Sequence, residues 1–158
     1  MIALESLLRY PFFDFLAYPM KAIAQISEEE TYPPDTIIFR ENERAQGLYI
    51  LVSGSVNLFF TIDLEYHPEW HKELLFSTIN PGELFGISAL IEPHILTSSA
   101  RTTKVSQVIK IDAVKLLALC DQDEQLAYGL IHQVAKATIE RLKATRSQLA
   151  SAWTAVLS

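Results

Sequence analysis

The sequence predicts an α+β fold in which short N-terminal helices precede a β sandwich or jelly-roll barrel, and one long helix follows it. Three observations support this prediction. Apolar residues recur at helical spacing near the N-terminus, and short segments rich in β-branched and aromatic residues fill the middle of the chain. From Glu124 to Val156 the chain has no proline and only one glycine, Gly129, which is typical of an unbroken helix.

The N-terminal helices are predicted before Glu30. Apolar residues recur there at helical spacing, with phenylalanines that add bulk: Leu16, Met20, Ile23 and Ile26, with Phe12, Phe13 and Phe15. We interpret the acidic run 28–30 as a solvated helix end. Pro33 and Pro34 then stop any helix and favour extended backbone.

The middle of the chain is predicted to form short strands separated by turn residues such as Gly54 and Gly82. The predicted strands are Thr36–Phe39, Leu48–Val52, Val56–Ile62, Glu73–Ile79, Ser98–Thr102 and Val105–Asp112. Closely spaced strands of this kind indicate a sandwich or a jelly-roll barrel. The polar segment Asp63–Lys72 is interpreted as the tip of a long hairpin.

The C-terminal part is predicted to be helical. Asp112 can cap a short helix over Ala113–Leu119, and Asp121 or Asp123 can cap the next one. A helix over Glu124–Val156 would be about 50 Å long at about 1.5 Å per residue.

A heptad seam runs along this helix. Its residues are spaced alternately by four and three positions: Ile131, Ala135, Thr138, Leu142, Thr145, Leu149, Ala152 and Val156. The alternative is a helix packed only on its own barrel, but such a stripe would drift off a strict heptad register. We therefore expect a homodimer through this helix. Thr138 and Thr145 need hydroxyl partners in a dry seam, from their own helix, the paired helix or a ligand.

Composition and charge exclude several classes of protein. The 158-residue chain has 49% apolar residues and a net charge of −6, so it is folded, acidic and long enough for a core. The single Cys120 excludes a disulfide framework and a cysteine-built zinc site, and we expect a small buried apolar side chain there. No apolar run approaches the ~18 residues of a spanning helix, and residues 1–18 do not have the pattern of a signal peptide. We expect a cytoplasmic protein without membrane contact.

Three stretches resemble the cyclic nucleotide-binding domain family. They are Tyr32–Phe39, Leu48–Val56 and Asn80–Gly86, and the resemblance spans roughly residues 16–149. The second and third stretches are fairly specific together, at this separation. The resemblance implies an eight-stranded jelly roll followed by a long helix that often forms the dimer. It divides the chain into a jelly-roll domain with N-terminal helices, residues 1–120, and a dimerisation helix, residues 121–158.

The resemblance also implies a ligand site, the phosphate-binding cassette. In the family this segment begins Phe-Gly-Glu, forms a short helix and ends with an Arg that pairs with the cyclic phosphate. Here the candidate cassette residues are Phe85, Gly86, Ile87, Ser88, Ala89, Leu90, Leu96, Thr97 and Ser98, and Thr145 resembles the adenine-contacting position on the long helix. Ile87 replaces the family's Glu, and Leu96 replaces its Arg.

The loss of these two residues predicts weak or absent cyclic AMP binding, because a buried phosphate needs a cation. Residues 74–100 contain no Lys or Arg, and Arg101 is offset by an odd number of positions, which places it on the opposite strand face. An anion would have only the backbone amides near 88–90 and the hydroxyls of Thr97, Ser98 and Ser99. Whether Ile87 and Leu96 fill the pocket stays open.

No catalytic residues, metal site or cofactor are predicted. His67, Glu69 and His71 alternate along one segment and could chelate a metal in a cupin-type jelly roll, but Pro68 and the polar neighbours indicate a loop. His94 and His132 are isolated, and no nucleophile–base pair is recognisable.

Three functions therefore stay in competition. The first is a stand-alone, dimeric regulatory module that binds a small nucleotide-like ligand or a protein partner. The second is a dimerisation scaffold that has lost its ligand, or the sensor part of a transcription regulator. The third, a cupin-type metalloenzyme, is the weakest. In the family's transcription factors a helix-turn-helix domain follows the long helix, whereas this chain ends at Ser158, so we expect no DNA binding by it.

Overall fold

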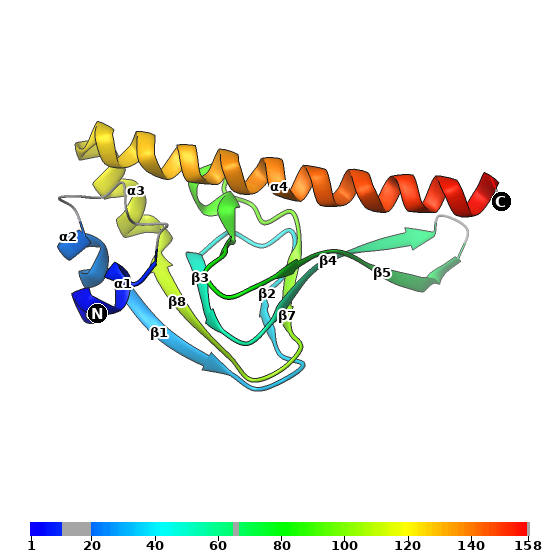
Figure 1. Ribbon diagram of the computed structural model, residues 1–158, viewed down its shortest axis with the longest axis horizontal. Coiled ribbons are helices and arrows are strands. Elements are labelled where there is room, and N and C mark those ends of the chain that lie inside the picture. The colour runs from blue at the N-terminus through cyan, green and yellow to red at the C-terminus, as the bar shows by residue number, and fades with distance from the viewer. Residues whose placement is uncertain (11–19, 65–66, 158) are drawn as a thin grey trace.

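The computed structural model describes residues 1–10, 20–64 and 67–157 of the chain. Within these residues, eight strands form two four-stranded antiparallel sheets, and a long helix crosses the barrel that they make (Figure 1). The predicted α+β fold with a jelly-roll barrel and a long C-terminal helix is confirmed. The predicted contribution of Phe12, Phe13, Phe15 and Leu16 to an N-terminal helix lies outside the described residues.

The two sheets are each built from strands distant in sequence. The first has the order β1 (Ser27–Tyr32), β8 (Ser106–Asp112), β3 (Gly47–Ser53) and β6 (Leu84–Phe85). The second has the order β2 (Ile37–Phe39), β7 (Ser99–Thr102), β4 (Val56–Leu64) and β5 (His67–Ile79). All six predicted strands are present, and β1 and β6 are additional.

The structure corrects the interpretation of one polar segment and part of the interpretation of another. Glu28–Glu30 is not a helix end but part of β1, which pairs with β8 from Ser27 opposite Ile111 to Tyr32 opposite Ser106. Charged residues suit this edge position because they discourage pairing with a further strand. Asp63–Lys72 does lie at the end of a long hairpin, as predicted, but most of it is strand rather than loop, since β4 and β5 continue their pairing to Asp63 opposite His71 and Leu64 opposite His67.

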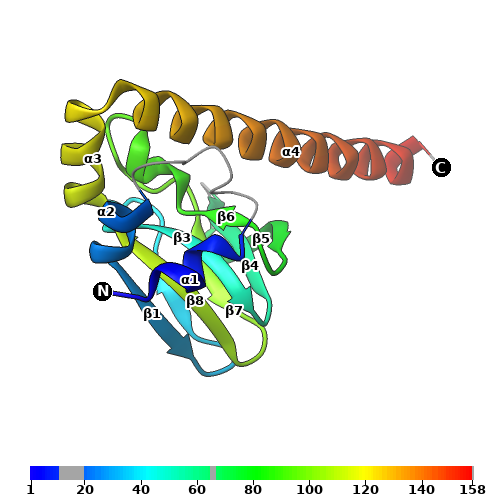
Figure 2. The ribbon, with the colours of Figure 1, turned by 60° about the vertical axis from the view of Figure 1, so that its left-hand side comes forward.

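The last two helices of the chain begin after aspartates that cap them. The described helices are α1 (Leu4–Leu8), α2 (Met20–Gln25), the 3₁₀ helix η2 (Ile87–Leu90), α3 (Ala113–Gln122) and α4 (Glu124–Leu157). Asp112 Oδ1 accepts a hydrogen bond from the Lys115 amide at 2.9 Å, and Asp123 Oδ1 accepts one from the Leu126 amide at 3.1 Å. The predicted caps are confirmed, with Asp123 rather than Asp121 capping α4. Figure 2 shows α1 and α2 beside the end of the barrel where β1 begins.

The core lies between the two sheets and extends under η2 and the start of α4. Aromatic rings of β2, β3 and β6 meet there: the Tyr49 and Phe85 rings stack at 5.2 Å between centroids, and Phe39 lies 5.5 Å from Tyr49 and 6.0 Å from Phe85. The largest fully buried side chains around them are Leu48, Ile50, Leu51, Ile79, Ile109, Ile111, Leu116, Leu126 and Leu130.

Helix α4 contacts the barrel along its first half and then extends past it (Figure 1). Leu126, Gly129, Leu130 and Val134 are buried, whereas residues 145–157 are all exposed. The β4–β5 hairpin reaches below this second half, where the Gln148 amide donates to the Phe76 carbonyl at 3.3 Å. All eight residues of the heptad seam are exposed, and three of them, Thr138, Leu142 and Thr145, also border a cavity beside the barrel. Within the described part of the chain, no helix has the length and apolar character to cross a membrane.

Candidate functional site

The cassette begins with a glycine that its backbone requires. Gly86 follows β6 with φ of 72°, a left-handed conformation that favours glycine, and η2 starts at the next residue. A Cβ atom on Gly86 would lie 2.9 Å from Tyr49 Cδ2. Because Phe85 pairs with Tyr49 across β6 and β3, the start of the cassette is held against the barrel core.

A cavity of about 300 Å³ lies between the cassette, the second sheet and α4. Its wall is mostly apolar and comes from elements distant in sequence. The lining residues are Phe39, Leu58, Phe76, Gly86, Ile87, Ser88, Leu96, Thr97, Ser98, Thr138, Arg141, Leu142 and Thr145. Ile87 and Leu96 therefore form part of the wall without filling the cavity, which answers the question that the sequence left open.

Most of the candidate cassette residues reach this cavity, but three do not. Gly86, Ile87, Ser88, Leu96, Thr97, Ser98 and Thr145 line it. Phe85, Ala89 and Leu90 are instead buried in the core, with exposed fractions of 0%, 0% and 8%. The Ser99 hydroxyl, a further candidate for an anion, accepts from the Glu41 amide at 2.9 Å and does not line the cavity.

The seam and the cavity share residues. Thr138, Leu142 and Thr145 belong to the heptad seam and also line the cavity. The Thr138 hydroxyl donates to the Val134 carbonyl at 2.8 Å, so it finds its partner in its own helix. The two interpretations of Thr145, seam residue and ligand contact, are therefore compatible in space.

Arg141 is a cation of the cavity wall that the cassette sequence did not reveal. It lies on the barrel-facing side of α4, partly buried, and its guanidinium Nη2 donates to the carbonyl of Leu84 in β6. The signal that could have found it is its position: with Leu130, Val134 and Ala137 it continues the buried stripe of α4, where a charged residue is unusual.

The charge of Arg141 is poorly compensated. Burial lowers the pKa of the Arg141 guanidinium, and the negative charge of Glu83 opposes this shift only in part. Among the ion pairs of the described residues, none includes Arg141. All other residues that line the cavity are uncharged. Arg141 is thus the one ionisable group in the described cavity wall.

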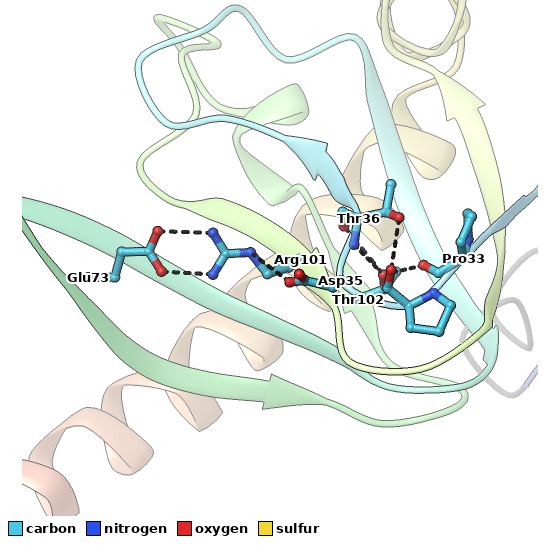
Figure 3. Close-up of polar contacts among 7 residues, drawn as sticks. Pro33, Asp35, Thr36, Glu73, Arg101 and Thr102 are labelled. Atoms are coloured by element: carbon cyan, nitrogen blue, oxygen red, sulfur yellow. Dashed lines mark hydrogen bonds and ion pairs between the residues drawn. The ribbon is translucent and has the colours of Figure 1, made fainter.

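Arg101, by contrast, is paired away from the cavity. Its guanidinium donates two hydrogen bonds to the Glu73 carboxylate, at 2.7 and 2.9 Å, and its Nε lies 3.6 Å from Asp35 Oδ1 (Figure 3). It also covers the Phe59 ring at 4.4 Å. Next to it, the Thr102 hydroxyl donates to the Pro33 carbonyl at 2.6 Å and accepts from the Thr36 amide at 2.9 Å (Figure 3).

The remaining candidates for chemistry are not assembled into a site by the described residues. His71 Nδ1 lies 2.5 Å from Asp63 Oδ1, whereas the side chains of His67 and Glu69 lie outside the described residues. No cluster of three metal-ligating side chains occurs in the part of the chain that can be searched. Burial, with Asp121 and Asp123 nearby, raises the pKa of the Cys120 thiol, which disfavours the reactive thiolate.

Comparison with known proteins places this architecture in one family. The family model of the cyclic nucleotide-binding domain matches residues 29–123. A crystal structure from Geobacter metallireducens GS-15, described provisionally as a cyclic nucleotide-binding protein, is 36% identical with a TM-score of 0.77, covering 90% of this chain and 99% of that one.

Two curated relatives are regulators or channels. The cyclic AMP receptor protein of Thermus thermophilus is 28% identical over 69% of this chain and 48% of its own length. The potassium channel KAT1 of Arabidopsis thaliana is 31% identical over 58% of this chain and 12% of its own length. The chain thus matches about half or less of these relatives. With its jelly roll, its cassette between Phe85 and Ser98 and its long α4, the chain belongs to the cyclic nucleotide-binding domain family.

Proposed function

We propose that this chain is a regulatory sensor module in which a small ligand binds between the cassette and α4. The observation that supports this most is the open cavity at that place, which contacts both the barrel and the long helix. A ligand that contacts both elements favours one packing of α4 over another, which is how a population shift is produced. The Thermus thermophilus relative is named a cyclic AMP receptor protein, and its likeness supports a sensor role.

The proposed module binds cyclic AMP weakly or not at all. Ile87 and Leu96 replace the carboxylate and the guanidinium that the family uses for the ribose and the phosphate. Losing one buried charge-assisted pair costs about 2–5 kcal/mol, which is roughly thirty- to several-thousand-fold in affinity. Isothermal titration calorimetry with cyclic AMP and cyclic GMP tests this. We expect no binding at micromolar concentration, and micromolar binding would contradict the proposal.

The family's chemistry should be recoverable if the cassette backbone is intact. We expect the double variant Ile87→Glu, Leu96→Arg to gain cyclic AMP affinity by at least about tenfold, since it restores both polar partners. The matched control is Ile87→Gln, Leu96→Met, which has similar side-chain sizes without the charges. A double variant that binds no better than this control would show that the cassette geometry differs from that of the family.

The proposed module also dimerises through the exposed seam of α4, with residues 121–158 acting as the dimerisation arm of the domain formed by residues 1–120. Because Thr138, Leu142 and Thr145 line the cavity and belong to the seam, a partner helix on this face would lie beside the ligand. We propose that the module acts in the cytoplasm without catalysis and without DNA binding of its own. Its acidic net charge of −6 supports the last point.

A further inference from the structure

The cavity wall indicates the chemical class of its ligand. Resting on the ligand site proposed above, we propose that the ligand is a small organic anion with an apolar body, and that its acidic group binds Arg141 on α4 rather than the cassette. The ligand would thus place its charge on the opposite side of the cavity from the position of a cyclic phosphate in the family.

The first argument is the state of Arg141. Its guanidinium has five N–H donors, and the structure shows one hydrogen bond from it, to the Leu84 carbonyl. A carboxylate, sulfonate or phosphate monoester can accept two parallel hydrogen bonds from such a fork. Because burial already disfavours the positive charge and Glu83 compensates it only in part, an anion at this place would stabilise it.

The second argument is the rest of the wall. Phe39, Leu58 and Phe76 come from the barrel, and Ile87 and Leu96 come from the cassette, so the rest of the wall is largely apolar apart from hydroxyl side chains. No carboxylate in the described wall is available for a sugar hydroxyl. A ligand with a compact aromatic or aliphatic body and a single acidic group therefore matches the wall, whereas a ribose would find only neutral hydroxyl partners there in place of water.

A structural role is the competing explanation for Arg141. On its other side the residue borders a second hollow, of about 430 Å³, that is also lined by Glu83, Lys136 and Glu140. In this explanation Arg141 only holds α4 against β6, through its hydrogen bond to the Leu84 carbonyl and its electrostatic attraction to Glu83. Replacement of a mere brace would lower stability without distinguishing an anionic ligand from a neutral one.

Two matched fluorescent probes separate these explanations. The anionic probe is 8-anilinonaphthalene-1-sulfonate, and the neutral probe is N-phenyl-1-naphthylamine, which has the same aromatic body without the sulfonate. We expect the wild type to bind the anionic probe more tightly. We expect Arg141→Gln to lower the affinity for the anionic probe by about ten- to hundredfold, because the substitution removes a hydrogen bond to a charged group. The affinity for the neutral probe should change by less than about twofold.

Two control variants assign the signal to the cavity and to this residue. Arg146→Gln removes an exposed arginine of the same helix that does not line the cavity, so it should change neither affinity. Thr97→Trp replaces an exposed residue of the cavity wall and should displace both probes from the cavity. Any probe that still binds the Thr97→Trp variant is bound outside the cavity, for instance on the apolar seam. Its signal is subtracted from that of the wild type.

The outcomes distinguish failure of this inference from failure of the proposed function. If neither probe binds the wild type more tightly than it binds the Thr97→Trp variant, the cavity takes no ligand of this size and the proposed sensor site is wrong. If both bind but Arg141→Gln changes them equally, the site stands and the anionic class is wrong. If Arg141→Gln does not fold, the wild-type comparison decides: equal or weaker binding of the anionic probe overturns the inference.

Discussion

The two arginines Arg101 and Arg141 show how surroundings decide what a guanidinium does. Hydrogen bonds to Glu73 raise the pKa of Arg101, whereas burial lowers that of Arg141. Arg101 has a carboxylate on its fork, a second acid at 3.6 Å and an aromatic ring beneath it, so its charge is satisfied within the chain. The Arg141 guanidinium donates to one carbonyl, that of Leu84, and the residue borders a cavity. Of the two arginines, only Arg141 is therefore suited to bind a ligand.

The Arg101–Glu73 pair predicts a small, pH-dependent contribution to stability. The pKa of Glu73 is lowered by its hydrogen bonds to Arg101, so the contribution is present above the unfolded pKa of about 4.3 and is lost as the pH falls through the folded value. Because the Glu73 side chain is 49% exposed, Glu73→Gln should cost less than about 1 kcal/mol at pH 7.

The measurement for this pair is urea unfolding at pH 7 and at pH 3. The difference between wild type and Glu73→Gln should shrink at the lower pH, because the contribution of the ionised carboxylate is lost as the pH falls toward its lowered folded pKa. Glu43→Gln, at an exposed glutamate for which no ion pair occurs among the described residues, is the control. A difference that is equal at both pH values would show that the charge of Glu73 is irrelevant.

Gly86 predicts a larger effect than a second glycine with a similar backbone. Gly82 has φ of 89° and open space where a Cβ would lie, so Gly82→Ala should cost about 1 kcal/mol from backbone strain alone. Gly86→Ala adds a contact of 2.9 Å with the Tyr49 ring and should cost about 2–4 kcal/mol. Thermal unfolding of both variants tests this order, and equal melting temperatures would mean that the ring moves aside freely.

At the scale of elements, the sequence reveals those whose pattern is local. The six predicted strands are rich in β-branched and aromatic residues, and the caps at Asp112 and Asp123 precede regular helical stretches. β1 was missed because the acidic run Glu28–Glu30 lacks the β-branched and aromatic residues that are typical of a strand. β6 has two residues, Leu84 and Phe85, too short for any periodic pattern.

The cap of α3 predicts a defined loss of stability. Asp112→Ala removes the acceptor of the Lys115 amide hydrogen bond at 2.9 Å, and such a cap contributes about 1 kcal/mol. Asp121→Ala, at an exposed residue in the last turn of α3, is the control and should change stability by less than about 0.5 kcal/mol. Chemical denaturation measures both, and equal effects would show that the Asp112 hydrogen bond contributes nothing net.

At the scale of the whole molecule, the site combines residues that no local motif contains. The cassette could be located from Phe85 and Gly86, and its missing Glu and Arg could be noted from the sequence. Arg141 could not be assigned to it, because it lies more than forty positions later and reaches the cavity only through the packing of α4 on β6. A search for a cation within residues 74–100 could find none, and the packing of α4 on the barrel brings one from outside that segment.

The exposed half of α4 leads to a prediction about assembly. Leu149 is 57% exposed and Val156 is 77% exposed in the single chain, although both belong to an apolar seam with heptad spacing. In a single chain these apolar side chains stay in water and do not stabilise the helix. Two copies that pair along the seam would remove them from water. Sedimentation equilibrium should therefore show a dimer at micromolar concentration.

A charge in this seam should separate the copies without unfolding them. Leu149→Glu places two carboxylates in the dimer interface and should raise the dimer dissociation constant by at least about thirtyfold, while the melting of the barrel at high dilution stays unchanged. Ser147→Glu adds the same charge at an exposed position outside the seam and should leave the dimer intact.

The seam lies beside the cavity through Leu142 and Thr145, so Leu149→Glu also tests whether pairing shapes the ligand site. If the wild type is a monomer at micromolar concentration, or if both variants dissociate alike, the seam has another role, because only pairing in heptad register distinguishes residue 149 from residue 147.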